Sequence, residues 1–269
     1  MIISTTSFIL TKDGTKRSSI FVKNFKLLAL LSLLIFVFSC QKYDLERINP
    51  LDPKSKIFTP YTTITDIDGN VYNTVIIGTQ IWMAENLKTT KFQNGDLIGT
   101  TIPSTLDISS ESTPKYQWAY GGNESNVATY GRLYTWYTIT DSRNVCPVNW
   151  HVPSDVEWHS LIQYIDTNAD PFNSDESLTA GGILKETGFT HWNSPNTGAT
   201  NSFGFTALPG GLRGYFGTFI DLRNSGNWYS SSELDATTPW IRSITYNYNK
   251  MLKWGYSKSY GYSVRCLKN

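Results

Sequence analysis

The stretch CPVNWHVPSDVEW, residues 146–158, contains the strongest local signal in the chain. Ser154 and Glu157 form an S-x-x-E capping box, in which each side chain satisfies a free backbone N–H at the start of a helix. Apolar residues then recur at the spacing of one helical face: Trp158, Leu161, Ile162 and Ile165. The stretch therefore predicts the main helix of the domain, with Cys146 tying the entry of this helix to the rest of the fold.

Composition is typical of a globular, β-rich protein. The 269 residues suit one large domain or two small ones. A net charge of +1 and 17% charged residues provide no strong field for nucleic acid or for an acidic partner. Aromatic residues make up 14% of the chain, which favours short strands and loops over a helical bundle.

Residues 1–40 have the pattern of an export signal. Basic residues precede the apolar run Leu27–Phe38, which is too short to span a bilayer stably and suits the core of a signal peptide. The run ends at Ser39-Cys40, which resembles a bacterial lipobox. We therefore expect a lipoprotein lipidated at Cys40 and anchored in the outer membrane or at the cell surface. The alternative is an uncleaved anchor with an incidental cysteine.

Residues 41–60 are predicted to be a tether, because three X-Pro pairs interrupt a segment with little apolar surface to bury. The folded domain is then residues 61–269, and it is predicted to open with a β-hairpin. Its turn is Asp68-Gly69, between strands at 62–65 and 71–77. A further strand at 81–83 is expected to place Trp82 in the core.

The middle of the chain has weaker signals. Residues 94–127 are loop-like. Residues 130–137 could be strand or helix, and a short helix or turn leading to Cys146 is the preferred interpretation. A second helix is expected over about residues 176–186. Gly181-Gly182 would weaken this helix, and Gly188 suits its C-terminal cap.

From about residue 203 the pattern changes to short aromatic strands between turns. A turn is predicted at Asn224–Asn227, and residues 240–248 alternate with the period of a strand. In the last strand, Tyr262, Val264 and Cys266 share one face.

Four segments of the chain resemble the Fibrobacter succinogenes major paralogous domain family: residues 66–87, 130–136, 146–158 and 263–266. The resemblance implies an exported bacterial protein with a C-type-lectin-like fold. Such a fold is α+β, with short twisted antiparallel strands, one or two helices and long loops. A more distant similarity to the formylglycine-generating enzymes extends to a closing Arg-Cys strand, but their reactive cysteine pair has no counterpart here.

Three cysteines are present. If Cys40 is lipidated, Cys146 and Cys266 remain as an even pair in an oxidising compartment, which favours a disulfide between them. Such a bridge would close a long loop, worth roughly 4–5 kcal/mol in the loop-entropy model. Two buried free thiols are the alternative.

No motif in the chain predicts catalysis, a cofactor or a metal. His151, His159 and His191 lack the partners and the spacing of metal ligands. Asp66 and Asp68 do not begin a calcium loop, because the glycine and the twelfth residue of that motif are out of place. Carboxylates are scattered: Glu85, Asp155, Glu157 and Glu233. Two of them could still meet in space as a glycosidase pair.

The aromatic C-terminal part provides the predicted ligand-binding surface, because rigid rings among small polar residues are the composition of antibody paratopes. The candidate residues are Tyr215, Trp228, Tyr229, Glu233 and Trp254. Trp228, Tyr229 and Trp254 are expected at loop tips and at least partly exposed, whereas Trp240 and Tyr262 are expected to be buried. The alternative is that most of these rings fill the core.

The sequence thus favours a non-catalytic, lipid-anchored binding module for an extracellular glycan or protein. A hydrolase or modifying enzyme of the cell envelope and a purely structural surface protein remain alternatives. A pocket with paired carboxylates or a metal would favour the enzyme, and an exposed Trp/Tyr face would favour binding.

Overall fold

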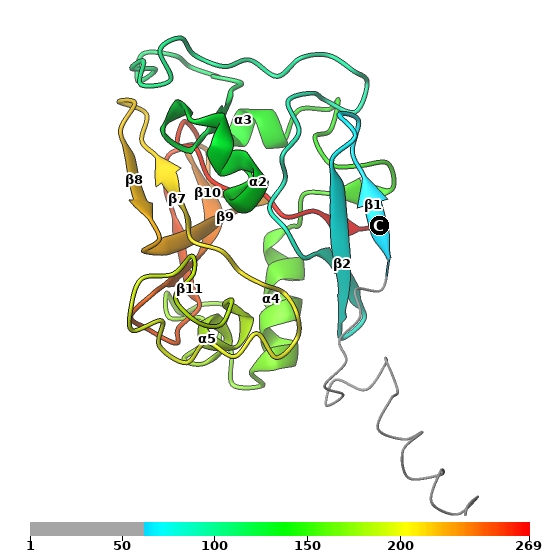
Figure 1. The fold of residues 1–269 in the computed structure, drawn as a ribbon, viewed down its shortest axis with the longest axis vertical. Helices are drawn as coiled ribbons and strands as arrows, with labels where there is room; N and C mark the ends of the chain where they lie inside the picture. The colour runs from blue at the N-terminus through cyan, green and yellow to red at the C-terminus, as the bar shows by residue number, and fades with distance from the viewer. Residues whose placement is uncertain (1–61) are drawn as a thin grey trace, which may run out of the picture. The chain divides into compact units, whose positions relative to one another are not determined.

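The structure is a computed structural model, and it describes residues 62–269. The predicted signal peptide, the lipidation site Cys40 and the tether lie outside the described residues. Residues 62–269 form an α+β fold of mainly antiparallel strands with a few short helices (Figure 1). None of the helices in this part of the chain has the length and apolar character needed to cross a membrane.

The elements follow one another as short strands, interrupted by helices in the first two thirds of the chain. In order they are β1 (Thr63–Thr65), β2 (Val71–Ile77), β3 (Gln80–Met83), β4 (Gln117–Ala119), the 3-10 turns η2 (Tyr120–Gly122) and η3 (Glu124–Asn126), α2 (Val127–Tyr130), β5 (Arg132–Tyr134), α3 (Trp136–Ile139), β6 (Trp150–His151), α4 (Asp155–Ile165), α5 (Ala180–Leu184), β7 (Gly210–Arg213), β8 (Phe219–Leu222), β9 (Ser225–Asp235), β10 (Thr238–Thr245), β11 (Leu252–Gly255) and β12 (Leu267–Lys268).

The largest sheet joins the two ends of the domain. Its strand order is β1-β2-β3-β12-β6, so the C-terminal strand lies between β3 and β6. The predicted β1–β2 hairpin is confirmed, with Thr65 opposite Val71 across the turn. Asp66 closes this turn by accepting hydrogen bonds from the backbone N–H groups of Asp68 and Asn70.

A second sheet has the order β11-β10-β9 and lies beside α4 (Figure 1). The turn predicted at Asn224–Asn227 is wrong in its position, because β9 already begins at Ser225. The chain reverses just before, where Asp221 and Arg223 have φ of 64° and 67°. Three of the four residues assigned to a turn therefore belong to a strand whose first six residues are buried.

The helix predicted from the capping box is confirmed as α4. Ser154 is its N-cap, and Ser154 and Glu157 exchange both hydrogen bonds of the box. Trp158, Leu161 and Ile162 are buried, and Ile165 at the end of the stripe is half-buried. The Trp158 indole packs 4.8 Å from the Trp82 ring, measured between centroids, which places both rings in the core as expected.

Two other predictions are corrected. The helix expected at 176–186 shrinks to the five residues of α5, because Ser177 pairs with Met251 in an isolated β-bridge and Lys185 has extended backbone. A Cβ on Gly181 would lie 2.0 Å from the Lys250 carbonyl oxygen, so the glycine serves close packing. Within residues 130–137, Arg132–Tyr134 forms a strand, β5, between the end of α2 and the start of α3, so the predicted helix is present only at the two ends. β5 pairs with β4, which lies inside the segment expected to be a loop.

The core has two clusters, and the disulfide lies in the first. Cys146 and Cys266 are bonded, with their Cα atoms 5.9 Å apart, which confirms the predicted bridge. Tyr262 and Val264 are buried in the same cluster, as expected from their shared face. The final strand is wrong in its position: β12 is Leu267–Lys268 and contains none of Tyr262, Val264 and Cys266, although Tyr262 makes an isolated bridge to Tyr134.

Candidate functional site

Two of the predicted ligand-binding rings are not on the surface. Trp228 and Tyr229 are both 0% exposed, so the prediction of exposed loop tips is wrong for them. They lie on β9, which pairs with β10 on one side, and Trp228 bridges to Ser263 on the other. The Trp228 indole N–H donates to Asn86 Oδ1 over 2.9 Å, which satisfies its polar atom inside the core.

Two other candidates lie apart from any common site. Tyr215 is half-buried and packs edge-to-face on Tyr260, with ring centroids 5.2 Å apart. Glu233 is exposed at the end of β9, and its carboxylate lies 2.5 Å from the Lys258 ammonium group. The structure therefore does not bring Tyr215 and Glu233 together with Trp254.

Trp254 is 45% exposed, as predicted, and it lines a groove of about 710 Å³. This volume lies within the range of roughly 300–1,000 Å³ that is usual for small-molecule sites. We call it the aromatic groove; its lining residues are Asp155, Val156, His159, Pro171, Phe172, Asn173, Ser174, Trp240, Lys253 and Trp254. Trp240, expected to be buried, is half-buried because it contributes to this groove.

The groove is built from three segments that are distant in sequence. The N-terminal end of α4 provides Asp155, Val156 and His159, and β10 and β11 provide the two tryptophans and Lys253. The third segment is the loop at 171–174, whose Phe172 is 96% exposed. This loop is fixed along β11, because the Lys253 backbone N–H donates to the Ser174 carbonyl oxygen over 2.8 Å.

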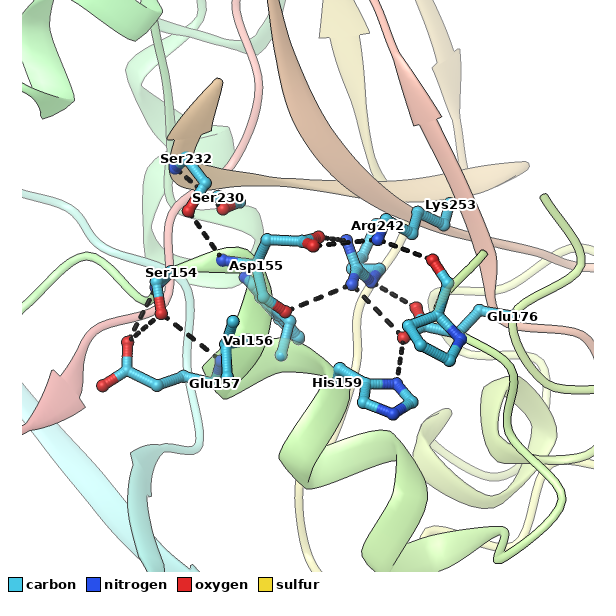
Figure 2. A network of polar contacts seen from close by, with 12 residues as sticks. Ser154, Asp155, Val156, Glu157, His159, Glu176, Ser230, Ser232, Arg242 and Lys253 are labelled. Carbon is cyan, nitrogen blue, oxygen red and sulfur yellow. Dashed lines mark hydrogen bonds and ion pairs between the residues drawn. The ribbon is translucent and has the colours of Figure 1, made fainter. Parts of the chain in front are cut away.

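Behind the lining residues, Arg242 is fully buried and lies between two carboxylates (Figure 2). Its guanidinium lies 2.8 Å from Asp155 Oδ1 and 2.5 Å from Glu176 Oε2. Glu176 also contacts His159 Nδ1 over 2.8 Å, and the Lys253 ammonium group contacts Asp155 Oδ2 over 2.8 Å. A buried charge of this kind requires partners of opposite charge, and the two carboxylates provide them.

The geometry of α4 explains why Asp155 and His159 meet the same network. They are four residues apart, so their side chains lie on one helical face.

The Glu157 carboxylate of the neighbouring capping box is held in its ionised form. Burial alone would raise the pKa of Glu157, but hydrogen bonds from the Ser154 N–H and hydroxyl and the contact with His151 outweigh it, and the pKa is lowered. The start of the helix is thereby fixed beneath the groove.

The charged groups at the aromatic groove contact one another. Glu176 is inaccessible, and both Asp155 oxygens contact cations. The histidines each contact a carboxylate: His151 meets Glu157 and His191 meets Glu186. Among residues 62–269, no three His, Cys, Asp or Glu side chains come together in a way that could hold a metal ion.

Most residues of this site were missed from the sequence, among them the charged residues Glu176, Arg242 and Lys253 and the loop residues Phe172, Asn173 and Ser174. One signal was available, since Arg242 interrupts an alternating face that also contains Trp240 and Ile244. A cation on an otherwise apolar strand face indicates a buried ion pair. Its partner Glu176 lies 66 residues away in sequence, and no local pattern indicates that contact.

Comparison with known proteins gives one match. The model of the Fibrobacter succinogenes major domain matches residues 75–268, which include every residue of the aromatic groove. No match was found among curated proteins or among solved structures.

Proposed function

Because this chain belongs to the Fibrobacter succinogenes major domain family, whose name states no ligand, we propose from the geometry of the aromatic groove that it is a non-catalytic module which binds a glycan. The observation that carries the proposal is an exposed tryptophan, Trp254, beside a groove of about 710 Å³. A second tryptophan, Trp240, and the exposed Phe172 line the same groove.

The chemistry of the lining favours a sugar over a purely apolar ligand. Tryptophan offers a large rigid face for the C–H surface of a pyranose ring. Polar groups stand beside these rings, namely the Asn173 amide, the Ser174 hydroxyl and the His159 imidazole. A few polar groups that orient a ligand against apolar walls are the usual composition of a binding pocket.

The carboxylates of the groove support binding rather than hydrolysis. A glycosidase needs one carboxylic acid to protonate the leaving group and a second carboxylate beside the scissile bond. Asp155 and Glu176 instead share the guanidinium of Arg242, and the Glu176 side chain is 0% exposed. Neither is free to take the role of an acid in contact with a substrate.

We place this module at the cell envelope, held by a lipid on Cys40. The Cys146–Cys266 disulfide supports export, since such bonds persist in oxidising compartments. A C-type-lectin-like arrangement is part of the proposal, supported by the short antiparallel strands and the long segments between them. Substitution of Cys40 by Ala should abolish labelling by lipid precursors and detach the protein from membranes; unchanged anchoring would contradict the lipoprotein assignment.

A glycan array probed with the full chain tests the binding function. Trp254→Ala should weaken binding of the selected glycan about 30-fold, equivalent to a hot spot of ~2 kcal/mol. Tyr248→Ala is the matched control, because Tyr248 is an exposed aromatic residue, 53% accessible, that does not line the groove. Equal affinity of the Trp254→Ala variant and wild type would refute the groove as the site.

A further inference from the structure

We propose that the aromatic groove selects an uncharged oligosaccharide, and that Asp155 determines this selectivity. The inference rests on the proposed function, namely that this groove holds a glycan. It adds the chemical class of the ligand and the residue that discriminates against acidic sugars.

The charges beneath the groove cancel. Arg242 and Lys253 supply two positive charges, and Asp155 and Glu176 supply two negative ones, with His159 counted as neutral. Each charge lies within 2.8 Å of an opposite charge, so the network is closed on itself. A charged ligand would therefore meet no net field of opposite sign at this surface.

The cations are also out of reach of an acidic sugar. The Arg242 side chain is 0% exposed and that of Lys253 is 5% exposed. The Lys253 ammonium group already contacts Asp155 Oδ2 and the Pro171 carbonyl oxygen, each over 2.8 Å, and lies 4.3 Å from the centroid of the Trp240 ring. A carboxylate or sulfate in the groove would have to separate these contacts to gain a partner.

Among the charged groups, Asp155 is the one a ligand meets most directly. Its side chain is 20% exposed and lines the groove, and its negative charge repels an acidic group brought close to it. A cationic ligand would have to compete with Arg242 and Lys253 for the two Asp155 oxygens, which these side chains already contact. Hydroxyl groups avoid both difficulties.

The groove retains neutral hydrogen-bonding groups that suit hydroxyls. His159 Nδ1 contacts a carboxylate oxygen, which only accepts, so Nδ1 carries a proton and Nε2 is the remaining polar atom of the ring. The Asn173 amide oxygen accepts from the Asp175 N–H over 3.0 Å, which leaves its NH₂ group as the donor side of this residue. Sugar hydroxyls both donate and accept, so they can use both groups.

The test compares one oligosaccharide in a neutral form and in an acidic form that carries a uronic acid at one position. The full chain should bind the neutral form at least about tenfold tighter. Asp155→Asn removes one negative charge and leaves the network with a net positive charge, so the preference should disappear or reverse. Asp175→Asn is the matched control, because it makes the same charge change beside Lys250, off the lining of the groove, and should retain the preference.

A second measurement does not depend on how the variants fold. Wild-type affinity for the acidic form should not fall as salt is raised from about 0.05 to 0.5 M, since no net attraction between its carboxylate and the groove is there to be screened. Tighter binding of the acidic form by wild type, an unchanged preference in Asp155→Asn, or an affinity for the acidic form that falls steeply with salt would each overturn the inference and leave a binding groove in place. Binding that is unaffected by Trp254→Ala would instead remove the proposed function.

Discussion

Removal of the Cys146–Cys266 disulfide should cost this domain a large part of its stability. The two cysteines are 120 residues apart, so the bridge closes more than half of the described chain into one loop. Replacement of both cysteines by alanine opens this loop in the unfolded state. Alanine is preferable to serine here, because both sites are buried and a hydroxyl there would lack a partner.

The loop length sets the magnitude. In the loop-entropy model, a loop of this length corresponds to a stabilisation of about 5 kcal/mol at 25 °C. For a domain of roughly 150–250 residues, each kcal/mol shifts the melting temperature by about 2–4 °C. The double variant should therefore melt roughly 10–20 °C lower than the oxidised wild type. The denaturant m-value should rise, because the unfolded chain is no longer constrained.

Urea unfolding followed by tryptophan fluorescence would measure this difference. Reduced wild type is the matched control, since it opens the same loop but keeps both sulfur atoms in the core. Its free energy of unfolding should fall almost as far as that of the double variant, and the remaining difference is the packing contribution of the two sulfurs. A loss below about 1 kcal/mol in both forms would refute the argument from the unfolded state.

Two further predictions concern stability. Trp158→Ala removes a 0% exposed ring between Trp82 and Trp228 and should lower the free energy of unfolding by about 3–5 kcal/mol, whereas a loss under about 1 kcal/mol in urea unfolding would contradict its place in the core. The pKa of Asp141 is lowered, mainly by its hydrogen bonds to Arg143, although burial opposes this shift. The stabilisation of the fold by ionised Asp141 is therefore complete above the unfolded pKa of about 4 and is lost as pH falls through the lower folded pKa. Asp141→Asn should accordingly lower the free energy of unfolding at pH 7 and lower it much less near pH 2. If the free energies of unfolding of the Asp141→Asn variant and of wild type change in parallel with pH, this carboxylate does not have the assigned role.

Local signals were sufficient for the elements whose geometry depends on near neighbours. The capping box of Ser154 and Glu157 predicted the start of α4, because the hydrogen bonds involved span three residues. The Asp68-Gly69 turn predicted the first hairpin for the same reason. Cysteine number and compartment predicted the disulfide, since only one pair remains once Cys40 is assigned to the lipid.

The sequence by itself thus determined the main helix, the opening hairpin, the paired cysteines and the family, whereas the tertiary structure decided which aromatic rings face solvent. Trp228 and Trp254 both lie on strands of the same sheet, but the Trp228 ring packs against Trp158 of α4 inside the core, whereas the Trp254 ring lines the groove, so one ring is buried and the other is exposed. The site itself has the same origin. Arg242 meets Glu176 and Asp155 only because the fold brings segments 66 and 87 residues apart into contact, and burial then forces these charges to pair.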